Sequence, residues 1–378
     1  MKNHPIIALS LLSVLGGQAV AQEVDIQPET LIVEPRISEG EHVYVMDMGI
    51  SGPSSISVLN AADLSLEGNI GSGNFSQMLM SPDKSSVYTS SVFMRRYTYG
   101  EVEAVITEWD SQALTSKREI VVSDKLAQTL SQRGALNLSA DGGYLVVQNA
   151  TPATSVSIVD LAENKELVEI PTPGCWTAYP SIEGNAFSTL CGDGTVVKYS
   201  YSADGSFGDP AKSDKIFDPD ANPLFGNAVR VDGNLVYVSY AGALTVVDDS
   251  ADVPTLVKTI DFAEEGWAPS GYNLMGYHDP SKTLFITMHS NPFDGSHKVP
   301  AEEIWAINME SGTVSGRSEA HGEGSITVSG GETPALFGID HIGGVHRYEV
   351  TLGDTVSLTQ AAAREGVAFF ATILSTYY

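Results

Sequence analysis

The fold of this chain is decided by the stretch Gly174-Cys175-Trp176-Thr177-Ala178-Tyr179-Pro180-Ser181-Ile182-Glu183-Gly184-Asn185-Ala186-Phe187-Ser188-Thr189-Leu190-Cys191-Gly192-Asp193-Gly194. It holds the only two cysteines, and its aromatic and small residues predict two short strands around a Glu183-Gly184-Asn185 turn. Glu183 lies midway between Cys175 and Cys191, so an antiparallel hairpin places the cysteines opposite each other. At a non-hydrogen-bonded pair their Cα atoms would be about 4.5 Å apart, within disulfide reach. We therefore predict a Cys175–Cys191 disulfide; two buried free thiols are the alternative.

The N-terminus has the pattern of a secretory signal. Lys2 is followed by an apolar run, Pro5 to Leu15, and by the small-residue cleavage pattern Ala19-Val20-Ala21. We predict a signal peptide over residues 1–21 and an exported mature chain, since no later segment approaches the roughly 20 apolar residues of a membrane span. Export to an oxidising compartment agrees with the disulfide.

The chain is strongly acidic, with 47 Asp and Glu residues against 20 Lys and Arg and a formal net charge of −27. Such a chain repels phosphates, so nucleic acid and anionic membranes are poor partners. A solvated acidic surface explains the charge most simply, and a docking face for a basic partner is the alternative.

A turn followed by a β-branched or aromatic strand recurs seven times along the chain. From Gly40 to Gly330 there are six intervals of about 48 residues, the period of a four-stranded propeller blade. The turns are centred on Gly40, Asp83, Gly142, Gly184, Gly233, Pro280 and Gly330. The sequence therefore predicts an all-β, seven-bladed β-propeller over residues 39–378, preceded by an N-terminal arm over 22–38.

Second strand patterns follow several of these turns and end in Asp or Asn. We interpret them as third strands whose last residue starts the outward turn; they are 105–110, 156–160, 244–248 and 304–308, and the fourth repeat departs from them with Lys198-Tyr199-Ser200. Asp47, Asp110, Asp160 and Asp248 are read as turn formers rather than catalytic acids. The longest interval predicts an insertion near Asp124 to Arg133, where a short helix is expected.

The first repeat lacks an inner strand, and this predicts how the ring closes. The apolar segment 366–374 is expected to pair beside His42–Asp47, which removes the exposed sheet edges.

Patterns that could carry chemistry are weak. Asp218-Pro219-Asp220-Ala221-Asn222 resembles a calcium loop, but Pro223 and Val229 stand where that loop needs Gly and Glu. The glycines of 68–73 lack dinucleotide-binding spacing. His278, His289 and His297 lie in one repeat and could converge, although ordinary loop histidines explain them better. No catalytic, cofactor-binding or metal-ligating residue is predicted in this chain.

Several strings together resemble one family, the large subunits of the quinoprotein amine dehydrogenases, nearer to the aromatic amine than to the methylamine branch. They are Val43-Tyr44-Val45-Met46-Asp47, Gln148-Asn149-Ala150-Thr151-Pro152-Ala153-Thr154-Ser155 with Ile158-Val159-Asp160, Gly174-Cys175-Trp176 with Cys191-Gly192-Asp193-Gly194, Gly271-Tyr272-Asn273-Leu274 with Gly276-Tyr277-His278, and Ser296-His297-Lys298 with Pro300-Ala301-Glu302-Glu303-Ile304-Trp305. They spread over most of the mature chain, and their combination is more specific than any one string.

The resemblance implies a periplasmic propeller that pairs with a small, disulfide-rich subunit in an assembly of two large and two small chains. The cofactor, tryptophan tryptophylquinone, then belongs to the small subunit, which oxidises amine to aldehyde and ammonia. Electrons leave to an azurin- or amicyanin-like blue copper protein. Trp109, Trp176, Trp267 and Trp305 are accordingly not cofactor precursors, and Trp109 and Trp305 fit a blade core.

One departure from the family concerns the channel mouth, where the family has an aromatic residue soon after the Asp that ends its first strand. Here Asp47-Met48-Gly49-Ile50-Ser51-Gly52-Pro53 has none, and the segment Val92 to Tyr97 is a candidate replacement. The alternative function is a stand-alone periplasmic propeller that binds a ligand or protein without redox activity.

Overall fold

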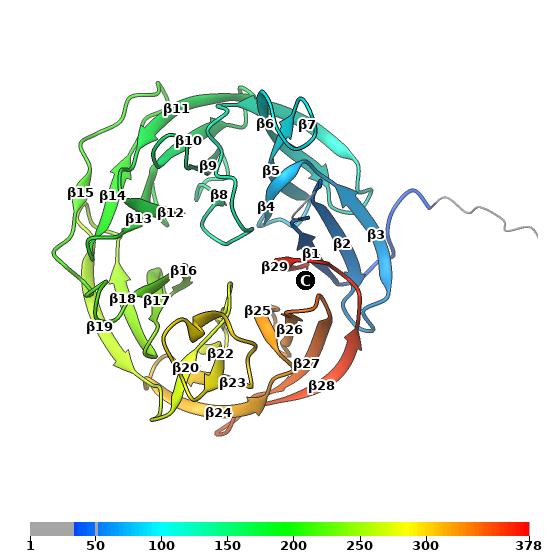
Figure 1. Cartoon of the computed structure of the whole chain (residues 1–378), viewed down its shortest axis with the longest axis vertical. Coiled ribbons are helices and arrows are strands. Elements are labelled where there is room, and N and C mark those ends of the chain that lie inside the picture. The colour runs from blue at the N-terminus through cyan, green and yellow to red at the C-terminus, as the bar shows by residue number, and fades with distance from the viewer. Residues whose placement is uncertain (1–33, 50–51, 378) are drawn as a thin grey trace, which may run out of the picture. The chain divides into compact units, whose positions relative to one another are not determined.

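A computed structural model describes residues 34–49 and 52–377 of the chain. The compact unit Arg36–Tyr378 consists, in its described part, of seven antiparallel sheets arranged in a ring, as the sequence predicts (Figure 1). The predicted signal peptide, residues 1–21, and most of the predicted arm lie outside the described residues. No helix within the described ranges is long and apolar enough to cross a membrane.

Each sheet is one blade, and its strands follow one another outward from the centre of the ring. Blade 1 has β29 (Ala371–Tyr377), β1 (His42–Asp47), β2 (Ser55–Asn60) and β3 (Leu66–Gly71); blade 2 has β4 (Asn74–Met80), β5 (Ser86–Met94), β6 (Val102–Asp110) and β7 (Ser116–Val122). Blade 3 has β8 (Leu136–Leu138), β9 (Tyr144–Asn149), β10 (Ser155–Asp160) and β11 (Lys165–Pro171); blade 4 has β12 (Cys175–Pro180), β13 (Ala186–Cys191), β14 (Val196–Ser200) and β15 (Ala211–Lys212). Blade 5 has β16 (Leu224–Val231), β17 (Asn234–Ser239), β18 (Ala243–Asp248) and β19 (Thr255–Asp261). Blade 6 has β20 (Trp267–Pro269), β21 (Met275–His278), β22 (Thr283–Ser290), the 3₁₀ helix η1 (Ser296–Lys298), β23 (Glu303–Asn308) and β24 (Thr313–Glu319); blade 7 has β25 (Glu323–Val328), β26 (Ala335–Asp340), β27 (Val345–Thr351) and β28 (Ser357–Arg364).

The ring closes as predicted, because the C-terminal β29 is the inner strand of blade 1 and pairs antiparallel with β1. The strand is shorter at its start than the predicted segment 366–374. It begins at Ala371, and the residues before it, including Phe369 and Phe370, belong to the connection from blade 7. This pairing covers the inner edge of β1 and completes blade 1 as a four-stranded sheet.

The acidic and amide residues that end third strands form turns, which confirms their predicted role. Asp110 Oδ1 accepts the backbone N–H groups of Gln112 and Ala113, at 3.0 and 2.7 Å. Asp160, Asp248 and Asn308 make equivalent bonds in their own blades. These side chains satisfy turn N–H groups that the ladder leaves unpaired.

The helix expected within 124–133 is absent: this segment is a loop on the inner side of the ring (Figure 1). Two of its backbone N–H groups donate to side chains of other blades instead of to carbonyl groups of the loop itself. Gln132 N–H donates to Gln77 Oε1 (2.8 Å) and Arg133 N–H to Asn273 Oδ1 (2.9 Å), so tertiary contacts override the local helical tendency.

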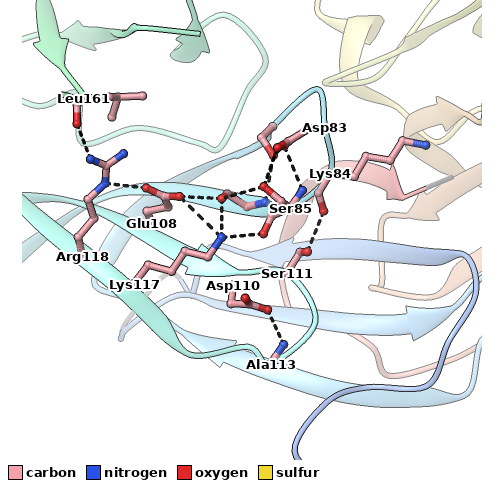
Figure 2. Close-up of polar contacts among 12 residues, drawn as sticks. Asp83, Lys84, Ser85, Glu108, Asp110, Ser111, Ala113, Lys117, Arg118 and Leu161 are labelled. Atoms are coloured by element: carbon pink, nitrogen blue, oxygen red, sulfur yellow. Dashed lines mark hydrogen bonds and ion pairs between the residues drawn. The ribbon is translucent and has the colours of Figure 1, made fainter.

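The core lies between the faces of neighbouring blades, where apolar side chains from adjacent sheets meet. One cluster joins blades 5 and 6 around Trp305, which is fully buried as predicted, whereas Trp109 is only half-buried. Polar contacts link blades at the outer edge. Figure 2 shows Arg118 of β7 between Glu108 (2.6 Å) and the carbonyl oxygen of Leu161, in the turn after β10 of the next blade.

Candidate functional site: the inter-blade face

The antiparallel order within each blade sorts the connections onto two faces of the ring. Connections between second and third strands share one face with those that lead from one blade to the next; we call it the inter-blade face. The opposite face carries the remaining turns. Large apolar side chains are exposed mainly on the connections of the inter-blade face: Tyr97, Tyr99, Phe293, Ile342 and Phe369. Ile182, Phe207 and Val253 are their counterparts on the opposite face.

Asp47, at the end of β1, fixes the last blade-to-blade connection. Its two carboxylate oxygens accept the backbone N–H groups of Phe369 (2.7 Å) and Phe370 (2.9 Å), and Met48 N–H donates to Phe370 O (3.1 Å). Asp47 is therefore more than the turn former that its sequence position predicts. It holds the connection so that Phe369 stays 76% exposed on the inter-blade face.

Tyr97 lies beside Gly52, in the segment after Asp47 that has no aromatic residue of its own. A Cβ atom added to Gly52 would lie 2.7 Å from the Tyr97 hydroxyl, so the ring reaches from the β5–β6 connection of blade 2 over blade 1. Tyr97 itself is 59% exposed. Ile50 and Ser51 of the neighbouring segment lie outside the described residues. Residues 92–97 thus contribute one aromatic side chain beside Gly52, and its role in lining a channel stays a prediction.

Tyr272 extends this aromatic region toward blades 6 and 7. Its ring contacts those of Phe370 and His341, each with 6.1 Å between centroids, and Lys298 Nζ lies 5.7 Å from the Tyr272 centroid. His341 is held in place because its ring nitrogens contact the carbonyl oxygens of Gly322 and Lys298, both at 2.9 Å. Backbone carbonyl groups thus fix the His341 ring that packs against Tyr272.

A cavity of about 640 Å³ opens on the same face between blades 5 and 6. Aromatic rings and carboxylates both line it, among them Tyr240, Trp267, Phe293, Glu265 and Asp294. His297 stacks on Tyr240 at 4.5 Å, and burial lowers the pKa of His297, which favours the neutral imidazole. Glu264 is paired with Arg317 at 2.7 Å.

The structure brings together only part of the histidine set considered from the sequence. His289 and His297 line the cavity between blades 5 and 6, whereas His278 ends β21 and lies on the opposite face. His278 contacts Ser281 Oγ and Gly331 O, both at 2.7 Å, as a turn histidine does. Asp218 accepts the N–H groups of Asp220 and Ala221, which makes its segment a turn.

The predicted disulfide is present. Cys175 and Cys191 pair across β12 and β13 with 3.9 Å between their Cα atoms, and the bridge is buried beside blade 4's inter-blade connections. The register is not uniform about Glu183, however, because a bulge lies between Trp176 and Tyr179 and Thr177 has φ +63°. No group of three or more His, Cys, Asp or Glu side chains suited to a metal occurs in the described ranges.

Two features of this face were missed from the sequence. Phe369 and Phe370 were assigned to the closing strand, although their position just after Gly366 and before the strand could have marked a connection. Tyr272 appeared only within a family string, since its neighbours Phe370 and His341 are distant in the chain. Nothing local in the sequence indicates that these rings meet.

Comparison with known proteins gives consistent matches. A family model described as methylamine dehydrogenase heavy chain matches residues 39–356. The methylamine dehydrogenase heavy chain of Methylophilus methylotrophus is 23% identical, covering 86% of this chain and 81% of the relative; that of Methylobacillus flagellatus is 22% identical, covering 82% and 80%. A solved Bacteroides fragilis structure, described as a proposed 6-phosphogluconolactonase, shares the fold with a TM-score of 0.61 at 12% identity, covering 93% of this chain and all of that one.

Proposed function

The chain belongs to the methylamine dehydrogenase heavy chain family, and from this premise we propose that it is the large subunit of an exported, periplasmic amine dehydrogenase. In this proposal it docks a small subunit that carries tryptophan tryptophylquinone, in an assembly of two large and two small chains. The enzyme oxidises primary aromatic amines to aldehyde and ammonia. It passes the electrons to an azurin- or amicyanin-like blue copper protein.

The observation that carries the docking proposal is the apolar character of the inter-blade face. Phe369, Ile342 and Phe293 are 76%, 80% and 66% exposed, on separate connections of neighbouring blades. Exposed apolar side chains gathered on one face mark interaction sites, whereas single ones are unremarkable. Membership of a heavy-chain family supplies the occupant, which is the light chain of the same enzyme.

The chemistry of the reaction is assigned to the partner, whose quinone would supply a two-electron acceptor for the amine. This chain's residues would shape the entrance. Tyr97, over Gly52, and Phe369, held by Asp47, give that entrance an apolar, aromatic wall that favours a flat substrate and excludes water. This wall supports the aromatic rather than the methylamine assignment.

Export is supported by the buried Cys175–Cys191 disulfide, since such bonds persist in oxidising compartments. The predicted signal peptide, residues 1–21, gives the same assignment.

The proposal is tested by purifying the tagged chain from its native host and recording its absorption spectrum with and without an aromatic amine. We expect a small chain to co-purify and a visible quinone band to bleach when phenylethylamine is added. Methylamine is the comparison substrate and should bleach the band more slowly. A chain that purifies alone, without chromophore or amine-dependent dye reduction, would instead favour the stand-alone binding protein.

A further inference from the structure

The centre of the ring contains a cavity of about 420 Å³ to which every blade contributes. Its walls come from the seven inner strands and are mostly apolar; Met78, Val229, Val328 and Leu374 are representative. Polar side chains also reach the lining, among them Asn137, Tyr277 and Ser375, and a volume of this size is within the range of small-molecule sites.

The loop 124–133 lies at one end of this cavity. Its contacts are with Ser76 and Gln77, Asn273 and Met275, Ile326, and Thr372. In each of the four blades that the loop contacts, the cavity-lining residues follow the loop-bonded residues along the chain. These lining residues are 78–80, 276–277, 327–328 and 373–375. The loop therefore separates the cavity from the inter-blade face. A glycine is needed where the loop leaves, because a Cβ on Gly134 would lie 2.7 Å from both Thr177 Cβ and Tyr179 Oη.

Arg133 directs its guanidinium from this loop into the cavity wall. Nη2 donates to Ile326 O at 2.7 Å and Nη1 to Met275 O. A guanidinium has five N–H donors, so three have no protein partner among the described residues. Burial lowers the pKa of Arg133 to about 10, and the group therefore stays protonated at neutral pH.

The cavity lacks a counter-charge for Arg133. None of its lining residues is Asp or Glu. The second arginine there, Arg230, is already neutralised by Asp249 through bonds of 2.6 and 3.0 Å. A cation without a counter-ion in a largely enclosed site is costly. Its presence here stands out because the chain as a whole has a net charge of −27.

We propose that this central cavity binds a small organic carboxylate, whose carboxylate pairs with Arg133 and whose apolar body lies against the surrounding wall. A planar carboxylate matches the fork of the guanidinium, and one negative charge balances the one unpaired positive charge. A phosphate dianion would instead leave one negative charge unbalanced in the cavity. The loop lies between this cavity and the inter-blade face, on which the proposed amine entrance lies.

Isothermal titration of the purified native protein tests this with benzoate as probe, benzamide as its uncharged match, and inorganic phosphate. We expect one benzoate per chain, no saturable binding of benzamide, and weaker binding of phosphate than of benzoate. Arg133→Gln should weaken benzoate roughly tenfold or more, the size of a lost charge-assisted interaction. Lys258→Gln removes one positive charge from the exposed outer strand β19 and should leave binding unchanged.

A second variant keeps the proposal testable if Arg133→Gln does not fold. Ser375→Met narrows the cavity at a partly exposed lining position without changing charge and should also weaken benzoate. Absence of benzoate binding, equal binding by Arg133→Gln, or tighter binding of phosphate would each overturn the proposal. Amine oxidation is measured in parallel and should be unaffected by benzoate, so failure here is distinct from failure of the proposed enzyme function.

Discussion

Phe369 and Asp47 show how single side chains shape the proposed docking surface. Asp47 binds two consecutive backbone N–H groups with its two carboxylate oxygens, and this leaves the Phe369 ring facing outward. The ring gains little by packing against its own chain, since three quarters of its surface is exposed. Its position is best explained by contact with a partner.

Phe369→Ala should therefore weaken association with the small subunit roughly tenfold or more, as for a central interface aromatic. The free energy of unfolding should change by less than about 0.5 kcal/mol, because the side chain is exposed. The matched control is Ile182→Ala, an exposed apolar residue on the opposite face. Sedimentation of the two-chain complex measures the strength of association. Equal weakening by both variants, or none by Phe369→Ala, would contradict a partner at this face.

The blades themselves were largely predictable, because their turns are encoded locally. Asp110 and Asp160 bond N–H groups two and three residues away, so the sequence pattern alone locates those turns. Arg133 was not predictable, since its carbonyl partners Met275 and Ile326 lie 142 and 193 residues further along the chain. The bulge at Thr177 was missed for the same reason: Ala178 N–H bonds Gly134 O, in the inserted loop (2.7 Å).

The disulfide of the β12–β13 hairpin yields a prediction about stability. Cys175 and Cys191 are 16 positions apart, and a closed loop of that size stabilises by about 3 kcal/mol in the chain-entropy treatment. The double variant Cys175→Ala/Cys191→Ala should lose roughly this free energy of unfolding in urea while its complex keeps full amine turnover. Loss of turnover with fold and assembly intact would assign the pair a redox role instead.

The contact between blades 2 and 3 depends on Arg118. Arg118→Met removes the bonds to Glu108 and to the turn after β10, and leaves a mostly buried carboxylate that keeps the Ser86 hydroxyl at 2.7 Å and Lys117 at 3.8 Å. We expect a loss of about 1–2 kcal/mol in urea unfolding. The control Lys165→Met breaks an ion pair of 3.9 Å whose side chains are 58% and 65% exposed, so its effect should stay below about 0.5 kcal/mol. Equal effects would show that Arg118 is only a surface charge.

The molecule as a whole should be sensitive to acid through its turns. Hydrogen bonds from serines and turn N–H groups lower the pKa of seven turn aspartates: Asp63, Asp83, Asp110, Asp141, Asp204, Asp218 and Asp248. A carboxyl whose pKa is lower in the folded than in the unfolded state stabilises the fold at pH values above its unfolded-state pKa. That stabilisation disappears as the pH falls through its folded-state pKa.

Asp83 isolates this effect, because hydrogen bonds led by that of Ser81 lower its pKa to about 2. Asp83→Ala should be less stable than the parent at pH 7, and the difference should shrink as pH falls from about 4 to about 2. As the pH falls, both proteins lose overall charge repulsion, and this shared effect cancels in the difference between them. A difference in urea midpoint that stays constant down to pH 2 would contradict the assignment.

Hydrogen exchange on the purified chain, alone and in complex with its small subunit, tests the central claim most directly. If the inter-blade face docks that subunit, the amides of 95–101, 291–302, 341–344 and 365–370 will be protected in the complex. The turns of the opposite face, such as 181–185 and 249–254, will exchange equally in both states. Protection confined to the opposite face, or no difference between the two states, would contradict the claim.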